Sequence, residues 1–114
     1  MAQYMLLVYQ PEVDPEEQAE REREMPMFVE LHRSLREAGL LVGVQRLRST
    51  ESATSVRVRG GQQQDASGPA VQSAEQLIGY YVLECKDANE AADLAATIPA
   101  AKVGTVEVRP VFAM

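Results

Sequence analysis

One histidine is the side chain of this sequence best suited to move a proton near neutral pH. His32 is the only histidine among the 114 residues, and an imidazole titrates close to neutrality, so it could act as a general base. The alternative is a residue at the edge of a buried helical face, with one ring nitrogen in water. We favour this alternative, because the sequence places no carboxylate that would orient the ring.

Two adjacent tyrosines, Tyr80 and Tyr81, offer phenol groups to a site. In a strand their side chains point to opposite faces, so at most one of them lines a given cavity. Core packing with a hydrogen-bonded hydroxyl is the favoured role for both. In the alternative role, Tyr81 joins His32 as a weak candidate for catalysis, and Tyr80 is a candidate ligand-binding residue.

Arginines lie in predicted strands or at strand ends, whereas acidic residues crowd residues 16–24. A planar guanidinium suits a carboxylate or a phosphate. Arg57 and Arg59 are therefore candidate ligand-binding residues for a small organic anion. An exposed sheet edge, or ion pairs with the acidic segment, is the favoured alternative.

Composition excludes several kinds of site and ligand. The net charge of −6, the absence of Trp and the presence of only two Phe argue against nucleic acid. Cys85 is the single cysteine, and one cysteine with one histidine argue against a structural zinc site, so we expect no metal. We also expect no cofactor. The apolar N-terminal run is too short for a membrane span and lacks a basic leader, so we expect a cytoplasmic protein.

Hydrophobic periodicity predicts a single domain over residues 1–114, with helices and strands interleaved. One helix is expected to start at Asp14, to be interrupted at Pro26 and to stop at Gly39. The second is expected to start at Asp87, and Pro99 to end it. The predicted strands cover residues 4–9, 40–48, 54–59, 79–84 and 105–111.

Two segments in the middle of the chain differ in how clearly their sequences predict secondary structure. The alternation in residues 54–59 predicts a half-buried strand with Val56 and Val58 on one face. Residues 62–76 are rich in Gln and carry the least pattern. The whole order is typical of an α+β, split βαβ arrangement, an antiparallel sheet with two helices on one face.

Two of the predicted strands are apolar on both faces, residues 4–9 and residues 80–83. Such strands are normally buried on both sides. Two helices on one face would leave an apolar patch on the other, which a second copy of the sheet could cover. A homodimer is therefore expected. In the alternative, the charged segment or the Gln-rich loop folds over the open face.

Several segments together resemble the YCII-related proteins of the DGPF branch. They are residues 4–9, 35–41, 55–59, 67–69, 75–81, 98–101 and 106–110. The resemblance implies a ferredoxin-like fold that pairs as a dimeric α+β barrel, and a bacterial origin. Some relatives sit beside or are fused to extracytoplasmic-function sigma factors, so the resemblance also implies a sigma-factor partner. The wider superfamily includes enzymes such as muconolactone isomerase.

The sequence departs from the pattern of that branch. Where its Asp-Gly-Pro-Phe motif would fall, this chain has Ser67-Gly68-Pro69-Ala70, so the turn remains while the carboxylate and the ring are lost. Ser67 is kept as a candidate ligand-binding residue. Gln72 and Met27 replace an acidic residue and a histidine of the relatives. Inherited His–Asp chemistry is therefore not expected.

Two functions follow. The preferred one is a non-enzymatic, dimeric binding or accessory module whose cleft accepts a small organic acid. The alternative is a small-molecule isomerase or lyase, in which His32 or a tyrosine moves protons and an arginine holds the substrate anion.

Overall fold

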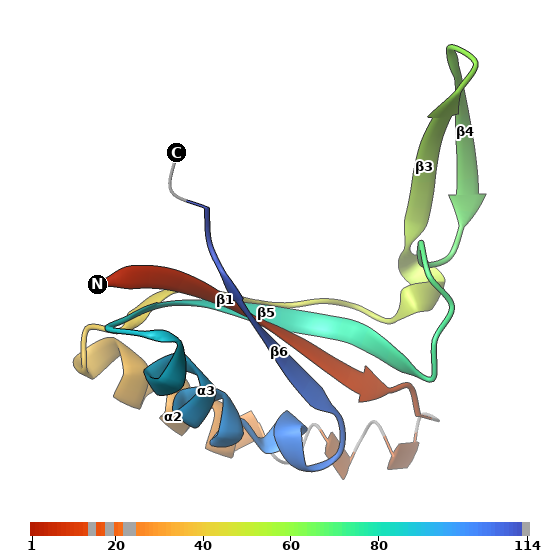
Figure 1. The fold of residues 1–114 in the computed structure, drawn as a ribbon. Helices are drawn as coiled ribbons and strands as arrows, with labels where there is room; N and C mark the ends of the chain where they lie inside the picture. Colours follow the sequence, from red (N-terminus) through yellow and green to blue (C-terminus); the bar gives the residue numbers. More distant parts are fainter. Residues whose placement is uncertain (14–15, 18–19, 22–24, 113–114) are drawn as a thin grey trace.

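The computed structural model describes residues 1–13, 16–17, 20–21 and 25–112. Six strands, two long helices and two short 3-10 helices follow one another along this part of the chain (Figure 1). They are β1 (Ala2–Pro11), α2 (Met25–Glu37), β2 (Leu41–Arg46), η1 (Thr50–Ser52), β3 (Thr54–Arg59), β4 (Gln62–Ser67), β5 (Glu75–Cys85), α3 (Ala88–Ala96), η2 (Pro99–Lys102) and β6 (Thr105–Pro110).

Four of the strands form one antiparallel sheet in the order β2-β5-β1-β6. The two strands that are apolar on both faces, β1 and β5, lie in its centre. Leu6 lies opposite Tyr81 on one side and opposite Val108 on the other. This order, with α2 and α3 as the two connections, is the predicted split βαβ fold of the α+β class.

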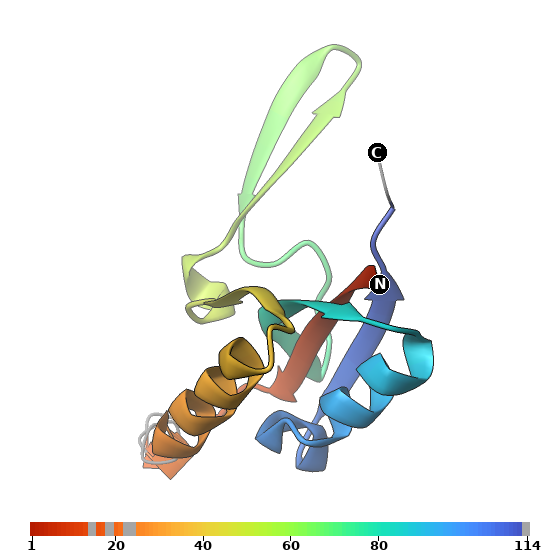
Figure 2. The same cartoon turned by 90° about the vertical axis from the view of Figure 1, so that its left-hand side faces the viewer.

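Both helices pack on the same face of the sheet (Figures 1 and 2). The core lies between them and the sheet, where Leu6, Leu83 and Cys85 are fully buried and Leu35 and Ile98 close the layer from the helix side. Burial of apolar surface on this scale is the main force that holds the layers together. We call the other face, which no described helix covers, the open face.

The helix ends follow the local chemistry that the sequence predicted. Gly39 has a φ of 74°, a conformation that suits glycine after a helix. The N–H groups of Gly39 and Leu40 then donate to the carbonyls of Arg36 and Leu35. At the start of α3, the carboxylate of Asp87 accepts a hydrogen bond from the N–H of Glu90, as its capping role requires.

The hairpin formed by β3 and β4 corrects two predictions. The predicted strand over residues 54–59 is confirmed as β3, but Val56 and Val58 are 56% and 61% exposed, so its predicted half-burial is wrong. Residues 62–67 are not irregular, because β4 pairs with β3 along its whole length. The turn uses Gly60 and Gly61, both with positive φ, which matches the twist of a tight hairpin. The hairpin forms its own two-stranded sheet and stands away from the rest of the molecule (Figure 1). We call it the arm.

Some element bounds differ from those predicted. β5 begins at Glu75 rather than at residue 79, β2 ends at Arg46, and β6 ends at Pro110. The second helix ends at Ala96, before Pro99, which begins η2. The predicted helix start at Asp14 lies outside the described residues. Among the helices that the structure describes, none has the length and apolar character needed to cross a bilayer.

Candidate functional site

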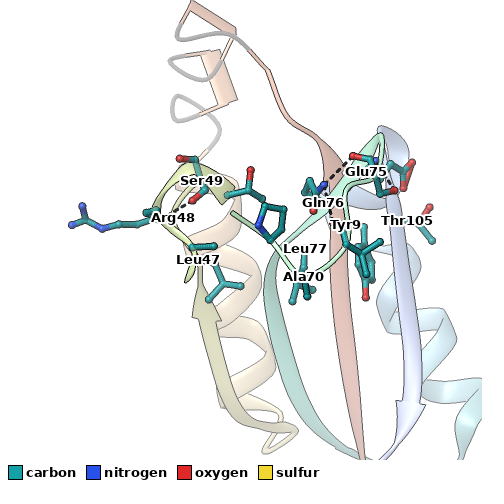
Figure 3. Close-up of a pocket in the computed structure, with 15 residues that line it drawn as sticks. Tyr9, Leu47, Arg48, Ser49, Ala70, Glu75, Gln76, Leu77 and Thr105 are labelled. Atoms are coloured by element: carbon teal, nitrogen blue, oxygen red, sulfur yellow. Dashed lines mark hydrogen bonds between the residues drawn. The ribbon is translucent and has the colours of Figure 1, made fainter. Parts of the chain in front are cut away.

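A groove of about 860 Å³ lies at the end of the open face, next to the base of the arm (Figure 3). Its floor is formed where β1 ends and where β5 and β6 begin. Tyr9 lies between Leu77 and Thr105 in the register of these strands, so the three side chains share the open face. The alternation of β1, which predicted an apolar second face, therefore supplies the floor.

Two loops form the walls of the groove. One runs through η1 and the other follows Pro69, and the residues that line the groove from them are Leu47, Arg48, Ser49, Thr50, Ser52, Ala53, Pro69, Ala70, Val71 and Ser73. Glu12 holds the first wall, because its carboxylate accepts hydrogen bonds from the N–H and the hydroxyl of Thr50 at 2.8 and 2.7 Å. These bonds lower the pKa of Glu12.

Hydrogen bonds fix the second wall to the sheet and to the first wall. The amide of Gln76, which is 8% exposed, donates to the carbonyls of Val71 and Ser73 at 3.3 and 3.0 Å. The N–H of Gly68 donates to the carbonyl of Ala53 at 2.8 Å. Both walls are therefore held in place before any ligand binds, which lowers the entropy cost of binding.

The sequence analysis missed Gln76. Its position in the sequence could have indicated its role. Gln76 is a polar residue in β5, on the face of the strand that otherwise carries core residues. A buried side-chain amide needs hydrogen-bond partners, so its presence there indicates a nearby structured loop.

The charged side chains of the groove do not form an anion site. Among the described lining residues Arg48 is the one cation and Glu75 the one carboxylate. Figure 3 shows the guanidinium of Arg48 directed away from the other lining side chains. The groove therefore presents apolar side chains and neutral hydroxyl groups to a ligand, beside the carboxylate of Glu75.

His32 and Tyr81 meet on the opposite, helix-covered face of the sheet. The Nε2 atom of His32 lies 2.8 Å from the hydroxyl oxygen of Tyr81, and the rings form a T-shaped pair with centroids 5.2 Å apart. Burial raises the pKa of Tyr81 to about 12. Burial, and to a smaller extent the cation Arg36, lowers the pKa of His32. At neutral pH the pair is therefore a phenol and a neutral imidazole joined by one hydrogen bond.

Comparison with known proteins places the chain in a family. The YCII-related domain matches residues 2–114, nearly the whole chain. This chain belongs to the YCII-related family. An uncharacterized protein of Rhizobium meliloti (strain 1021) is 37% identical over 93 residues, which cover 80% of this chain and 75% of that protein. The family predicted from the sequence is confirmed, and assignment to the DGPF branch stays a prediction.

In this YCII-related protein the motif segment contributes to the groove through its last two residues. Pro69 and Ala70 line the groove, whereas Ser67 is exposed at the end of β4. The candidate ligand-binding residues Arg57 and Arg59 are exposed on the arm and do not line the groove. Tyr80 is half-buried on the open face, between Leu7 and Gln45 in the register.

The structure thus brings together one pair of the predicted site residues, His32 and Tyr81. Neither of them lines the groove, nor the smaller cavity of about 240 Å³ between α3 and β6. Cys85 is fully buried, and among the described residues no cluster of three His, Cys, Asp or Glu side chains could hold a metal ion.

Proposed function

We propose that this YCII-related protein is a homodimeric, non-enzymatic module that binds a small, uncharged and largely apolar compound in the groove. The observation that carries the proposal is the groove itself. It combines an apolar floor with two walls that hydrogen bonds hold in place. Ligand sites of proteins are typically such concave, preformed and mostly apolar clefts.

The polar groups of the groove favour a ligand without charge. The hydroxyl groups of Thr50 and Ser52 already donate to protein oxygens. Those of Tyr9 and Thr105 take part in no hydrogen bond within the described part of the chain. The hydroxyl groups of Tyr9 and Thr105 can therefore orient a ligand that carries one or two hydrogen-bonding groups. An organic carboxylate would instead face Glu75 with no cation directed at it. A small organic anion, the ligand expected from the sequence, is supported less well by this geometry.

The open face supports the homodimer. Met5, Leu7, Tyr80 and Val82 lie side by side on its central strands and are half-buried, although no described helix lies over them (Figure 1). An apolar face of this kind normally has a partner. A second copy packed there would bury these side chains and would roof the groove, because Tyr9 and Leu77 belong to the same face.

The described residues do not support the alternative in which the Gln-rich loop or the charged segment folds over the open face. The Gln-rich residues 62–64 belong to the arm, which stands away from the sheet (Figure 1). Arg21 of the charged segment donates to the side chain of Gln10 and the carbonyl of Pro11. Gln10 points to the helix-covered face, since Tyr9 points to the open face.

The second function, an isomerase or lyase, is supported less well. It would assign proton transfer to His32 or Tyr81, and the sheet separates these residues from the groove. A sigma-factor partner, implied by the resemblance, also stays a prediction.

Native mass spectrometry of the purified protein, without added ligand, tests the proposal first. We expect twice the mass of the chain plus a small adduct. Binding of Nile red, an uncharged apolar dye, then serves as a probe: Ala70→Trp, which fills the groove, should weaken dye binding at least about tenfold. Ala88→Trp, at an exposed position of α3, should leave it unchanged.

Two results would contradict this function. If the protein has no adduct and Ala70→Trp leaves dye binding unchanged, the groove is not the ligand site. If purified protein turns over a small-molecule substrate and His32→Ala abolishes that turnover, the module is an enzyme.

A further inference from the structure

The arm is a regular hairpin that packs against no other element of the described chain. Its first strand alternates in pattern, the two strands pair over six positions, and Gly60 and Gly61 adopt the positive φ of a tight turn. A single two-stranded hairpin is at best marginally stable in water. The arm therefore lacks, within one chain, the packing that normally stabilises a hairpin.

One face of the arm carries exposed apolar side chains. Val56 lies opposite Asp65 and Val58 opposite Gln63, so the two valines share a face. They are 56% and 61% exposed. Two neighbouring β-branched side chains on a hairpin face normally pack against another surface.

A second exposed apolar group lies at the other end of the sheet. Val111 is tied to the start of β1, because its N–H donates to the carbonyl of Gln3. Phe112 follows it and is 85% exposed. We call these two residues the tail. The arm and the tail rise on the same side of the sheet, the side of the open face, near opposite ends of β1 (Figures 1 and 2).

We propose that the arm is a dimerisation arm, whose valine face packs on the tail, Val111 and Phe112, of a second copy of the chain. The inference rests on the homodimer proposed above and adds the contacts that make it. In an isologous pair, the two open faces meet at a two-fold axis. If this axis crosses the strands obliquely, the arm end of one sheet lies over the tail end of the other. Each arm then meets the tail of the other copy.

The contact between the arm and the tail is apolar. Asp65 is the one charged residue on the face of Val56 and Val58, whereas Arg57 and Arg59 lie on the opposite face of the arm, opposite Gln64 and Gln62 in the register. Val111 and Phe112 are 39% and 85% exposed, so burial of apolar surface would be the main favourable contribution to this contact.

The area that a stable dimer needs also favours contacts beyond the sheet. The four strands have 10, 11, 6 and 6 residues, which at about 3.3 Å per residue and about 4.8 Å between strands project onto about 500 Å². A stable interface buries about 800 Å² per partner. Contacts made by the two arms would extend the interface beyond the sheet face alone.

The test compares variants of the full chain by sedimentation equilibrium over a dilution series. We expect Val56→Glu with Val58→Glu, and separately Phe112→Glu, to raise the dimer dissociation constant at least about tenfold. Val103→Glu is the matched control, because Val103 is 58% exposed at the end of η2, outside the arm and the tail. Circular dichroism of each variant checks that the fold is kept.

A cross-link identifies the contact directly. Val58→Cys protein and Phe112→Cys protein are mixed and oxidised, and a disulfide-linked heterodimer is expected only when the arm of one copy reaches the tail of the other. A wild-type dimer with no cross-link and unchanged dissociation constants would overturn the arm contact while leaving the homodimer intact. A wild-type monomer at every concentration would overturn both.

Discussion

His32 and Tyr81 are 49 positions apart in the sequence, and their side chains share a hydrogen bond of 2.8 Å between Nε2 and the hydroxyl oxygen. The bond joins α2 to the central strand β5 across the helix-covered face. Tyr81 is 4% exposed and His32 is half-buried. The pair therefore forms a hydrogen bond that links α2 to β5 within an otherwise apolar layer.

Removal of the Tyr81 hydroxyl should abolish this hydrogen bond and lower the stability of the fold. We expect Tyr81→Phe to lower the free energy of unfolding by about 1 kcal/mol, because the half-buried imidazole loses its partner. Chemical denaturation measures the change. Tyr80→Phe is the matched control: it removes a hydroxyl from the next residue, on the other face, and should change the stability little. Equal losses in the two variants would show that the hydrogen bond contributes nothing specific.

Stability should depend on pH through His32. Burial lowers the pKa of its ring in the folded state below the ordinary value of 6.5, so the unfolded chain binds more protons between these two pKa values. The contribution of the neutral ring is present above pH 6.5 and is lost as the pH falls through the lower, folded pKa. Glu12 titrates in a separate window, since its pKa is lowered from 4.5.

The measurement is the free energy of unfolding of wild type and of His32→Gln, over the pH range in which His32 titrates and over the more acidic range in which Glu12 titrates. We expect wild type to lose stability relative to the variant as the pH falls below 6.5. A constant difference between the two proteins throughout this range would contradict the assignment.

Gly104 should tolerate no side chain. A Cβ atom at this position would overlap the carbonyl oxygen of Tyr9 and crowd the Cα atom of Gln10, and neither backbone atom can move without opening the end of β1 and β6. We expect Gly104→Ala to destabilise the fold by more than about 2 kcal/mol and to weaken Nile red binding, because Tyr9 and Thr105 form the floor of the groove. Thermal unfolding and dye titration measure these effects.

Gly43 provides the control for this substitution. A Cβ atom at Gly43 would meet nothing within 4 Å, so Gly43→Ala should change stability and dye binding little. If Gly104→Ala were equally harmless, the close approach of the two strands at the groove would be wrong.

Much of the fold follows from local patterns in the sequence. The apolar character of β1 and β5 on both faces was read from their sequences, and the structure places these two strands in the centre of the sheet. The helices cover one face, and the predicted cover of the other face stays a prediction. The start of α3 at Asp87 and the stop of α2 at Gly39 were predicted from capping chemistry, which acts within one helical turn. The family was also recognisable from ordered short segments.

Only the tertiary structure decided the arrangement of the candidate site. Alternation in residues 54–59 is the same for a buried strand and for an exposed hairpin, so the exposure of Val56 and Val58 depends on where the rest of the chain lies. The groove joins residues from the ends of three strands and two loops, and the bond between His32 and Tyr81 joins a helix to a strand. Such contacts depend on the packing of distant segments, whereas periodicity and capping report only on near neighbours in the chain.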